Sequence, residues 1–270
     1  MSDNEKLPLV SVVMGTYNGS PRIKKAVESI LNQSYANLEI IICDDASTDD
    51  TLQIITKMAA ADKRIIVIRN TVNSGLNISL NKCIEASQGK YIARMDDDDL
   101  SIFNRLEMQV EFLENHPEYA LVGCSKRYFD ENGIWGQAKA KPCPTVADVF
   151  TSHAFSHPTV MMRRDTLQAV GMYSTDKLNR RGQDYDLWCK LYNAGFKGYN
   201  LPYFLFDYYE SKTSVTRRKL KFRIDHIKKQ LIWRKRLGLP ISYLRYPLMD
   251  VVKCFLPSFL YRQLRKQRFK

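Results

Sequence analysis

The 270-residue sequence has no run of the roughly 18 uncharged apolar residues that a membrane-spanning helix needs. The most apolar stretch near the C-terminus is interrupted by Arg245, Asp250 and Lys253. The six cysteines stand singly, without a C-x-x-C pair, which argues against zinc or redox sites and favours reduced thiols. The first dozen residues lack a basic region followed by an apolar run, so no secretory signal is expected. These absences predict a cytoplasmic protein that does not cross a membrane.

Excess positive charge is missing from most of the chain and is confined to its last fifth. Residues 1–211 contain 23 Lys and Arg against 27 Asp and Glu, a net charge of −4. Residues 212–270 contain 18 against 2, a net charge of +16. We therefore predict a basic, amphipathic helical tail with an anionic partner, either a membrane leaflet or nucleic acid. The alternative is a solvated helix pair that covers the rest of the protein.

Apolar runs of strand length alternate with helical segments through the first hundred residues. Five apolar residues have the spacing of a helix with one buried face: Ile23, Ala26, Val27, Ile30 and Leu31. The expected strands are 9–14, 38–43, 65–69 and 91–95. Ser47 with Asp50 predicts the start of a second helix, and Gly89 predicts the end of a third that spans about 78–87. The pattern is typical of a Rossmann-like nucleotide-binding half, about residues 1–100.

Strands and helices are mixed beyond residue 100, where we expect a second half spanning about 101–211. The expected helices are 104–114, 184–194 and 217–236, and the expected strands are 119–123, 159–163 and 199–206. The predicted fold class is therefore α/β, with a mostly parallel central sheet flanked by helices.

Four consecutive carboxylates, Asp96 to Asp99, directly follow a predicted strand, at the sheet edge where open α/β folds bind ligands. Side chains alternate along an extended chain, so Asp96 and Asp98 would share one side. Oxygen ligands favour Mg²⁺ or Mn²⁺, whose open positions substrate phosphates can fill. The alternative is a solvated acidic loop in which an Asp, Asp99 in particular, caps the next helix.

A second acidic pair, Asp44 and Asp45, ends the preceding strand at the same edge. Carboxylates there suit hydrogen bonds to a ribose or a base. The sequence lacks both the G-x-G-x-x-G and the G-x-x-x-x-G-K-[ST] motifs. A nucleotide diphosphate would therefore be held through a metal ion rather than by a glycine-rich loop.

These residues fall in segments whose order resembles family 2 glycosyltransferases of the GT-A fold, over about residues 8–210. The likeness is greatest to bacterial enzymes that build O-antigen, capsule and exopolysaccharide repeat units. The segments are PLVSVVMGTYNG at 8–19, ICDDASTD at 42–49, NSGL at 73–76, GKYIARMDDDD at 89–99, HPTV at 157–160 and QDYDLW at 183–188.

The resemblance implies a role for each matching position. Residues 1–211 would form the catalytic domain, and Asp98 would bind the Mn²⁺ or Mg²⁺. His157 and Gln183 would lie beside the acceptor, and Asp184 would be the general base. Gln183 departs from the family's usual Glu-Asp pair. The implied nucleotide-binding residues are Thr16, Tyr17, Asp45, Asn73, Gly75 and Asp96.

The resemblance also implies a reaction. A carboxylate base would take the proton of an acceptor hydroxyl, the metal would stabilise the departing diphosphate, and one displacement would invert the anomeric centre. A polymer synthase would carry a Q-x-x-R-W motif, whereas here Trp233 precedes Arg234. We therefore expect transfer of one hexose or N-acetylhexosamine from a UDP-sugar to a lipid-linked diphosphate oligosaccharide. The tail would hold the enzyme at the inner face of the cell membrane.

Three alternatives stay open at this point. The acceptor could be soluble or a protein. A sugar-phosphate nucleotidyltransferase would need a basic, glycine-rich loop early in the chain, whereas GTYNG at 15–19 contains no Lys or Arg. A nucleic-acid-binding protein would explain the tail and not the acidic strand ends, so no nucleic-acid partner is expected.

Overall fold

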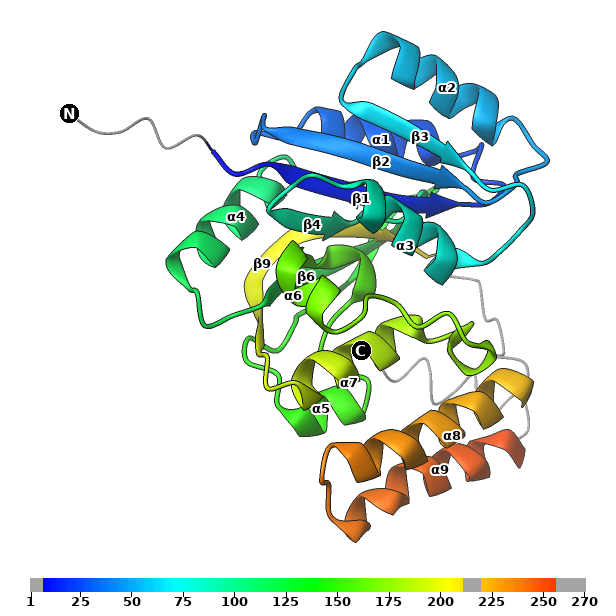
Figure 1. Cartoon of the computed structure of the whole chain (residues 1–270), viewed down its shortest axis with the longest axis vertical. Coiled ribbons are helices and arrows are strands. Elements are labelled where there is room, and N and C mark those ends of the chain that lie inside the picture. The colour runs from blue at the N-terminus through cyan, green and yellow to red at the C-terminus, as the bar shows by residue number, and fades with distance from the viewer. Residues whose placement is uncertain (1–6, 211–219, 256–270) are drawn as a thin grey trace.

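One large sheet organises the computed structural model, which describes residues 7–210 and 220–255 (Figure 1). The strand order is β3-β2-β1-β4-β8-β6-β9-β5, and β7 pairs with β6 outside this path. The strands are β1 Val10–Thr16, β2 Leu38–Asp44, β3 Ile65–Arg69, β4 Tyr91–Arg94, β5 Leu100–Ser101, β6 Leu121–Asp130, β7 Gly133–Ala138, β8 Met161–Arg163 and β9 Gly198–Tyr209.

The first four strands are parallel, as expected for a nucleotide-binding half. The second half is mixed, because β8 runs antiparallel to β4 and β6 whereas β6 and β9 are parallel. The carboxyl ends of β1, β2 and β4 therefore meet at one edge of the sheet.

Helices cover both faces of the sheet, and alternate residues of the strands contribute to two apolar clusters. Val12 faces the cluster that includes α1 and α4, whereas its neighbour Val13 faces the cluster that includes α3 and α7. The helices are α1 Ile23–Leu31, α2 Thr51–Ala61, α3 Leu76–Ala86, α4 Arg105–Asn115, α5 Val146–Phe150, α6 Arg164–Ala169, α7 Gln183–Asn193, α8 Leu220–Arg236 and α9 Arg245–Phe255. Three short 3₁₀ turns are η1 His157–Thr159, η2 Lys177–Asn179 and η3 Ile241–Leu244.

The predicted start of the second helix was wrong, and so was the role predicted for Gly89 at the end of the third. The second helix begins at Thr51 rather than near Ser47, because the Ser47 hydroxyl accepts a hydrogen bond from the Asn18 amide at 3.0 Å. Ser47 thus ties the β1–α1 loop to the end of β2. The third helix ends at Ala86, before Gly89. A Cβ at Gly89 would lie 2.7 Å from the Leu9 carbonyl oxygen, which is too close for a side chain. Gly89 therefore allows the segment before β4 to pass close to the segment before β1.

The end of the described chain forms a helix pair, α8 and α9, that lies along the lower part of the molecule in Figure 1. α8 contacts α5, α7 and η2. The predicted basic helix is confirmed over Leu220–Arg236, and its first three predicted residues, 217–219, lie outside the described residues. Within residues 7–210 and 220–255, every helix is too short or too polar to span a bilayer.

Candidate functional site

Polar residues gather where β1, β2 and β4 end. Thr16 closes β1, Asp44 and Asp45 end β2, and the acidic run follows β4. The Asp45 amide donates to the Thr16 carbonyl at 2.8 Å, and the Thr16 hydroxyl donates to the Asp97 carboxylate. The sheet edge thus connects the two acidic segments through the first strand.

Carboxylate oxygens of Asp96, Asp98 and Asp99 lie within 4.8 Å of one another. We call these three residues the acid cluster. Asp96 and Asp98 lie together as expected, although not by strand alternation, because Asp97 and Asp98 form a turn after the end of β4. Asp99 belongs with them rather than capping the next helix, because α4 has Asn104 at its N-cap and Asp99 accepts from the Tyr209 amide at 2.7 Å.

Burial and mutual repulsion make the acid cluster costly to ionise without a cation. Burial, together with the charges of Asp96 and Asp97, raises the pKa of Asp98 to about 6. Burial and the same kind of repulsion raise the pKa of Asp99 well above its usual range. The guanidinium of buried Arg94 forms an ion pair with Asp96 and offsets one of these charges.

The acid cluster fits a divalent cation such as Mg²⁺ or Mn²⁺. Its donors are carboxylate oxygens, which these hard ions prefer. In the part of the chain that the structure describes, the Asp99 Oδ2 atom is buried and accepts no hydrogen bond. A buried acceptor without a partner costs free energy that a coordinated ion would recover.

Asp45 organises the loop before α3 rather than presenting a free carboxylate. Its oxygens accept from the amides of Ser74 and Gly75, each at 2.8 Å, and from the Asn70 side chain at 2.7 Å. This fixes the segment that carries Asn73, whose side chain is exposed. Asn73 and Gly75 therefore lie beside Asp45, as a shared nucleotide site requires.

Tyr17 is 49% exposed and follows Thr16 at the same strand end. An exposed aromatic ring next to a buried polar strand end suits stacking against a base. The roles of Tyr17, Thr16 and Asp45 in nucleotide binding remain predictions.

Asp184 lies in the first turn of α7 and is half-buried. The charges of Asp184 and Asp96, after burial itself, raise the pKa of the Tyr173 hydroxyl. Asp184 and Asp96 thus both act electrostatically on the Tyr173 hydroxyl, and the charge of Arg94 opposes them. Gln183, one residue earlier, is 9% exposed.

His157 is buried, and its Nε2 atom lies 2.7 Å from the Tyr173 hydroxyl oxygen. Burial and then the charge of Arg94 hold the pKa of His157 well below its usual range. The ring is thus neutral and already hydrogen-bonded, and it orients Tyr173. Its predicted contact with the acceptor stays a prediction.

Sequence reasoning assigned no role to Arg94 or Tyr173. Arg94 had a usable signal, because it lies two residues before Asp96 and so projects from the same side of the extended segment. Tyr173 had none, since only tertiary packing brings it into contact with His157.

Comparisons with known proteins agree with this geometry. The model of Glycosyl transferase family 2 matches residues 11–187. EpsE of Bacillus subtilis (strain 168), whose name describes a glycosyltransferase, is 39% identical over 264 residues, which cover 97% of this chain and 94% of EpsE.

A second relative is WfaP of Escherichia coli, named as a UDP-Glc:alpha-D-GlcNAc-diphosphoundecaprenol beta-1,3-glucosyltransferase. It is 33% identical over 195 residues, which cover 72% of this chain and 74% of WfaP. The crystal structure of S. aureus TarS 1-349 in complex with UDP-GlcNAc has the same GT-A fold, with a TM-score of 0.70 at 18% identity. The match covers 89% of this chain and 72% of the TarS chain. The family match spans more than half of the chain and contains the acid cluster and Asp184, so the protein belongs to glycosyl transferase family 2.

Proposed function

We propose that the protein transfers one sugar from a UDP-sugar to a lipid-linked diphosphate oligosaccharide in bacterial surface polysaccharide synthesis, with inversion. The observation that carries this proposal is the acid cluster, which follows β4 at the sheet edge where β1 and β2 also end. The acid cluster would supply ligands for a metal-bound diphosphate, and Asp184 in the first turn of α7 would supply a base. The names of EpsE and WfaP support the reaction class.

The donor would lie along the carboxyl ends of β1, β2 and β4. The loop that Asp45 fixes would hold the uridine with Tyr17 and Thr16, and Asp96 would approach the ribose. Asp98, with Asp96 or Asp99, would hold Mn²⁺ or Mg²⁺. When bound, such an ion supplies Lewis-acid stabilisation of the leaving diphosphate.

Asp184 would accept the proton of the attacking hydroxyl. An alcohol is a very weak acid, so its attack on the anomeric carbon needs a carboxylate within hydrogen-bond reach. Inversion follows because a single displacement converts an α-linked donor into a β-linked product. The β-linkage in the name of WfaP agrees with this stereochemistry.

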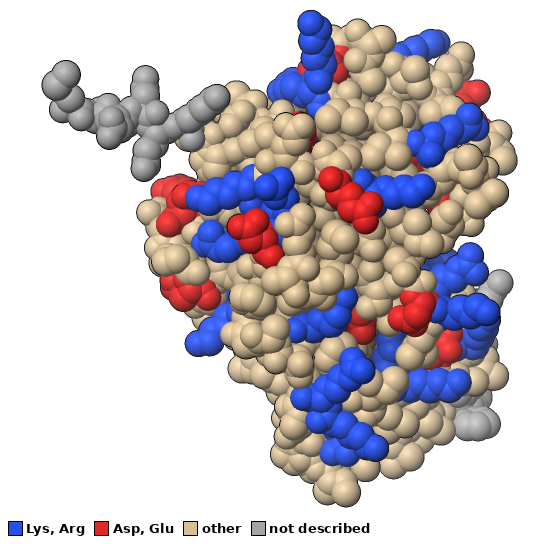
Figure 2. Space-filling view, in the orientation of Figure 1, with Lys and Arg blue, Asp and Glu red and all other residues tan. Residues whose placement is uncertain are grey.

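The helix pair α8–α9 would hold the enzyme peripherally at the inner, anionic face of the cell membrane. Figure 2 shows Lys and Arg gathered over the lower part of the molecule, where these helices lie. On α9, Leu248 is 64% exposed and Val252 is 56% exposed. Apolar side chains among cations suit a leaflet of anionic lipid, to which each cation contributes about 1 kcal/mol.

A screen of nucleotide sugars against synthetic lipid diphosphate-sugar acceptors tests the reaction, with Mn²⁺ or Mg²⁺ present and the new linkage determined by NMR. We expect a β-linked product from one UDP-sugar. Transfer to water-soluble acceptors alone would refute the lipid acceptor, and an α-linked product would refute inversion. Release of pyrophosphate from a nucleoside triphosphate would instead indicate a nucleotidyltransferase.

Co-sedimentation with vesicles tests the membrane proposal. The protein should bind vesicles that contain phosphatidylglycerol at low salt, bind phosphatidylcholine vesicles much less, and dissociate as ionic strength rises. Failure to bind anionic vesicles even at low salt would refute it.

A further inference from the structure

The first helix of the basic tail contacts the turn that leads into the general base. α8 packs across α7 and η2, and two of its side chains make polar contacts there. Lys229 is 2% exposed and Trp233 is 3% exposed, so neither belongs to the solvated face of this helix. Burying an ammonium group is costly unless it is well hydrogen-bonded. The Lys229 ammonium must therefore be well hydrogen-bonded in the folded protein.

The Lys229 ammonium donates to two consecutive backbone carbonyls. Its Nζ atom lies 2.5 Å from the Arg181 oxygen and 3.1 Å from the Gly182 oxygen. These are the last two residues before α7, and Asp184 lies two residues further on. Charge-assisted hydrogen bonds of this kind fix the geometry of the groups that they join.

Gly182 has a φ of +72°, a left-handed conformation that glycine adopts without strain. A Cβ at this position would lie 2.8 Å from the Lys229 Nζ atom. A side chain larger than that of glycine at position 182 would therefore collide with the Lys229 ammonium.

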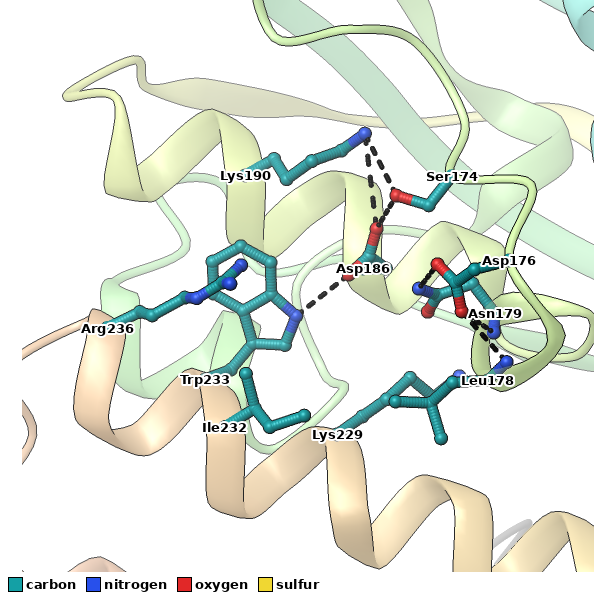
Figure 3. Close-up of a pocket in the computed structure, with 10 residues that line it drawn as sticks. All are labelled: Ser174, Asp176, Leu178, Asn179, Asp186, Lys190, Lys229, Ile232, Trp233 and Arg236. Carbon is teal, nitrogen blue, oxygen red and sulfur yellow. Dashed lines mark hydrogen bonds and ion pairs between the residues drawn. The ribbon is translucent and has the colours of Figure 1, made fainter.

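A cavity of about 260 Å³ lies between η2, α7 and α8 (Figure 3). Its walls include Asp176, Asn179, Lys190 and Lys229. Close packing is therefore incomplete where these three elements meet. The Lys229 hydrogen bonds join α8 to the turn before α7 beside this cavity.

A second contact ties the same two helices together. The Trp233 indole N–H donates to Asp186 Oδ1 at 2.9 Å, and the Ser174 hydroxyl donates to Oδ2 at 2.6 Å. Figure 3 shows Trp233 pointing from α8 to this carboxylate on the first turn of α7. α8 thus holds the start of α7 on both sides of Asp184.

We propose that Lys229 is a positioning residue for Asp184, so that α8 is part of the catalytic unit and not only of the tail. The Lys229 ammonium fixes the Arg181–Gly182 turn, and this fixes the first turn of α7 and the direction of its carboxylate. This inference rests on the proposed function, because it assigns the base role to Asp184. A carboxylate displaced by about 1 Å can lose on the order of a hundredfold in rate.

The test compares wild type with Lys229→Met, Lys229→Arg and the neighbouring exposed Lys228→Met. For each protein we would measure kcat and donor KM in the transfer assay and UDP affinity by calorimetry. Lys229→Met should lose about tenfold or more in kcat, with donor KM and UDP affinity within about twofold of wild type. Lys229→Arg keeps a cationic donor, but its larger guanidinium must fit the close contact with Gly182, so it should recover only part of kcat. Lys228→Met should behave as wild type.

Two further measurements keep the test decisive if Lys229→Met unfolds. Trp233→Phe keeps an aromatic ring, although a smaller one, and removes the hydrogen bond to Asp186. It should lower kcat several-fold with unchanged UDP affinity. Amide exchange of residues 182–186 should be faster in this variant than in wild type.

The proposal fails if folded Lys229→Met keeps wild-type kcat, or if UDP affinity falls as much as kcat. If Lys229→Met is unfolded, wild-type kcat in Trp233→Phe would also contradict it. If wild type itself transfers no sugar, the proposed function fails instead, so the two failures are distinguishable.

Discussion

Asp98 illustrates how a single residue can be unfavourable for the fold and useful to the site. Its carboxylate is held beside Asp96 and Asp97 in a largely buried place. Such an arrangement stores electrostatic repulsion that a divalent ion relieves on binding. The same repulsion makes the unfolding free energy of the metal-free protein depend on pH.

The raised pKa of Asp98 predicts how stability depends on pH. A folded-state pKa of about 6 exceeds the unfolded value of about 3.9, so the folded state binds this proton more tightly. The resulting stabilisation is complete below about pH 4 and is lost as pH rises through about 6. Between these values, the unfolding free energy of the metal-free wild type should fall by about 2 kcal/mol more than that of Asp98→Asn.

Denaturant unfolding at several pH values, with a chelator present, measures this difference. Titrating groups remote from Asp98 contribute equally to both proteins and cancel. The pKa of Asp99, which the Asp98 charge helps to raise, changes the difference in the same direction. Identical pH slopes for wild type and Asp98→Asn would contradict the electrostatic account of the acid cluster.

Asp184→Asn isolates the proposed base. An amide of the same shape cannot accept the proton, so kcat should fall by about 10²- to 10⁴-fold while UDP affinity stays within about twofold. Steady-state kinetics and calorimetry measure the two quantities. The control is Asp165→Asn, an exposed carboxylate on α6, which should leave both unchanged. Full transfer by Asp184→Asn would remove the base assignment.

Residue patterns predicted part of this site. Strand alternation predicted that Asp96 and Asp98 lie together, and they do, but through a turn at Asp97 and Asp98. The acidic strand ends indicated the sheet edge where the acid cluster lies. Asp99 was the ambiguous member, because an Asp before a helix is more often a cap. Its contact with the Tyr209 amide joins residues 110 positions apart, which local spacing cannot predict.

At the scale of elements, the first half of the fold could be predicted more closely than the second. The parallel strands β1 to β4 are apolar and separated by helices, and two of their three pairings, β1–β2 and β2–β3, join strands that are consecutive in the chain. By contrast, β8 has three residues and lies between β4 and β6, so its place depends on distant contacts. The capping box of α5, formed by Thr145 and Asp148, was a readable signal that the sequence analysis missed.

The variant Gly89→Ala tests whether a glycine is needed where the segment before β4 passes the start of β1. Gly89 was interpreted as a helix end, but it lies where β4 approaches Leu9 and Ser11 of the β1 segment. An added Cβ would meet backbone atoms at 2.7 Å, so Gly89→Ala should lower the unfolding free energy by about 1–3 kcal/mol.

Denaturant unfolding of Gly89→Ala and of Gly136→Ala would measure this cost. Gly136 lies in β7, and the nearest atom to its added Cβ is a Tyr128 carbon at 3.6 Å, so its variant should stay within about 0.5 kcal/mol of wild type. Equal stability of Gly89→Ala and wild type would refute the close-approach interpretation.

Over the whole molecule, the acidic first part of the chain and the basic last part contact each other in the folded structure. The acidic part supplies the sheet edge, and the basic part supplies α8, which contacts the turn before Asp184. Composition predicted a basic tail but could not predict that Lys229 and Trp233 are buried, because they have the same residue types as the exposed cations and rings beside them. A helix expected to act at a surface therefore also contributes to the site.

The account depends most on where the metal ion and the donor meet. A crystal structure with UDP and Mn²⁺, using anomalous scattering to locate manganese, tests this directly. We predict manganese within about 2.5 Å of an Asp98 oxygen, bridging to the UDP diphosphate, with Asp184 facing the same cleft. Manganese at another site, or UDP bound in a cleft that Asp98 and Asp184 do not share, would contradict the account.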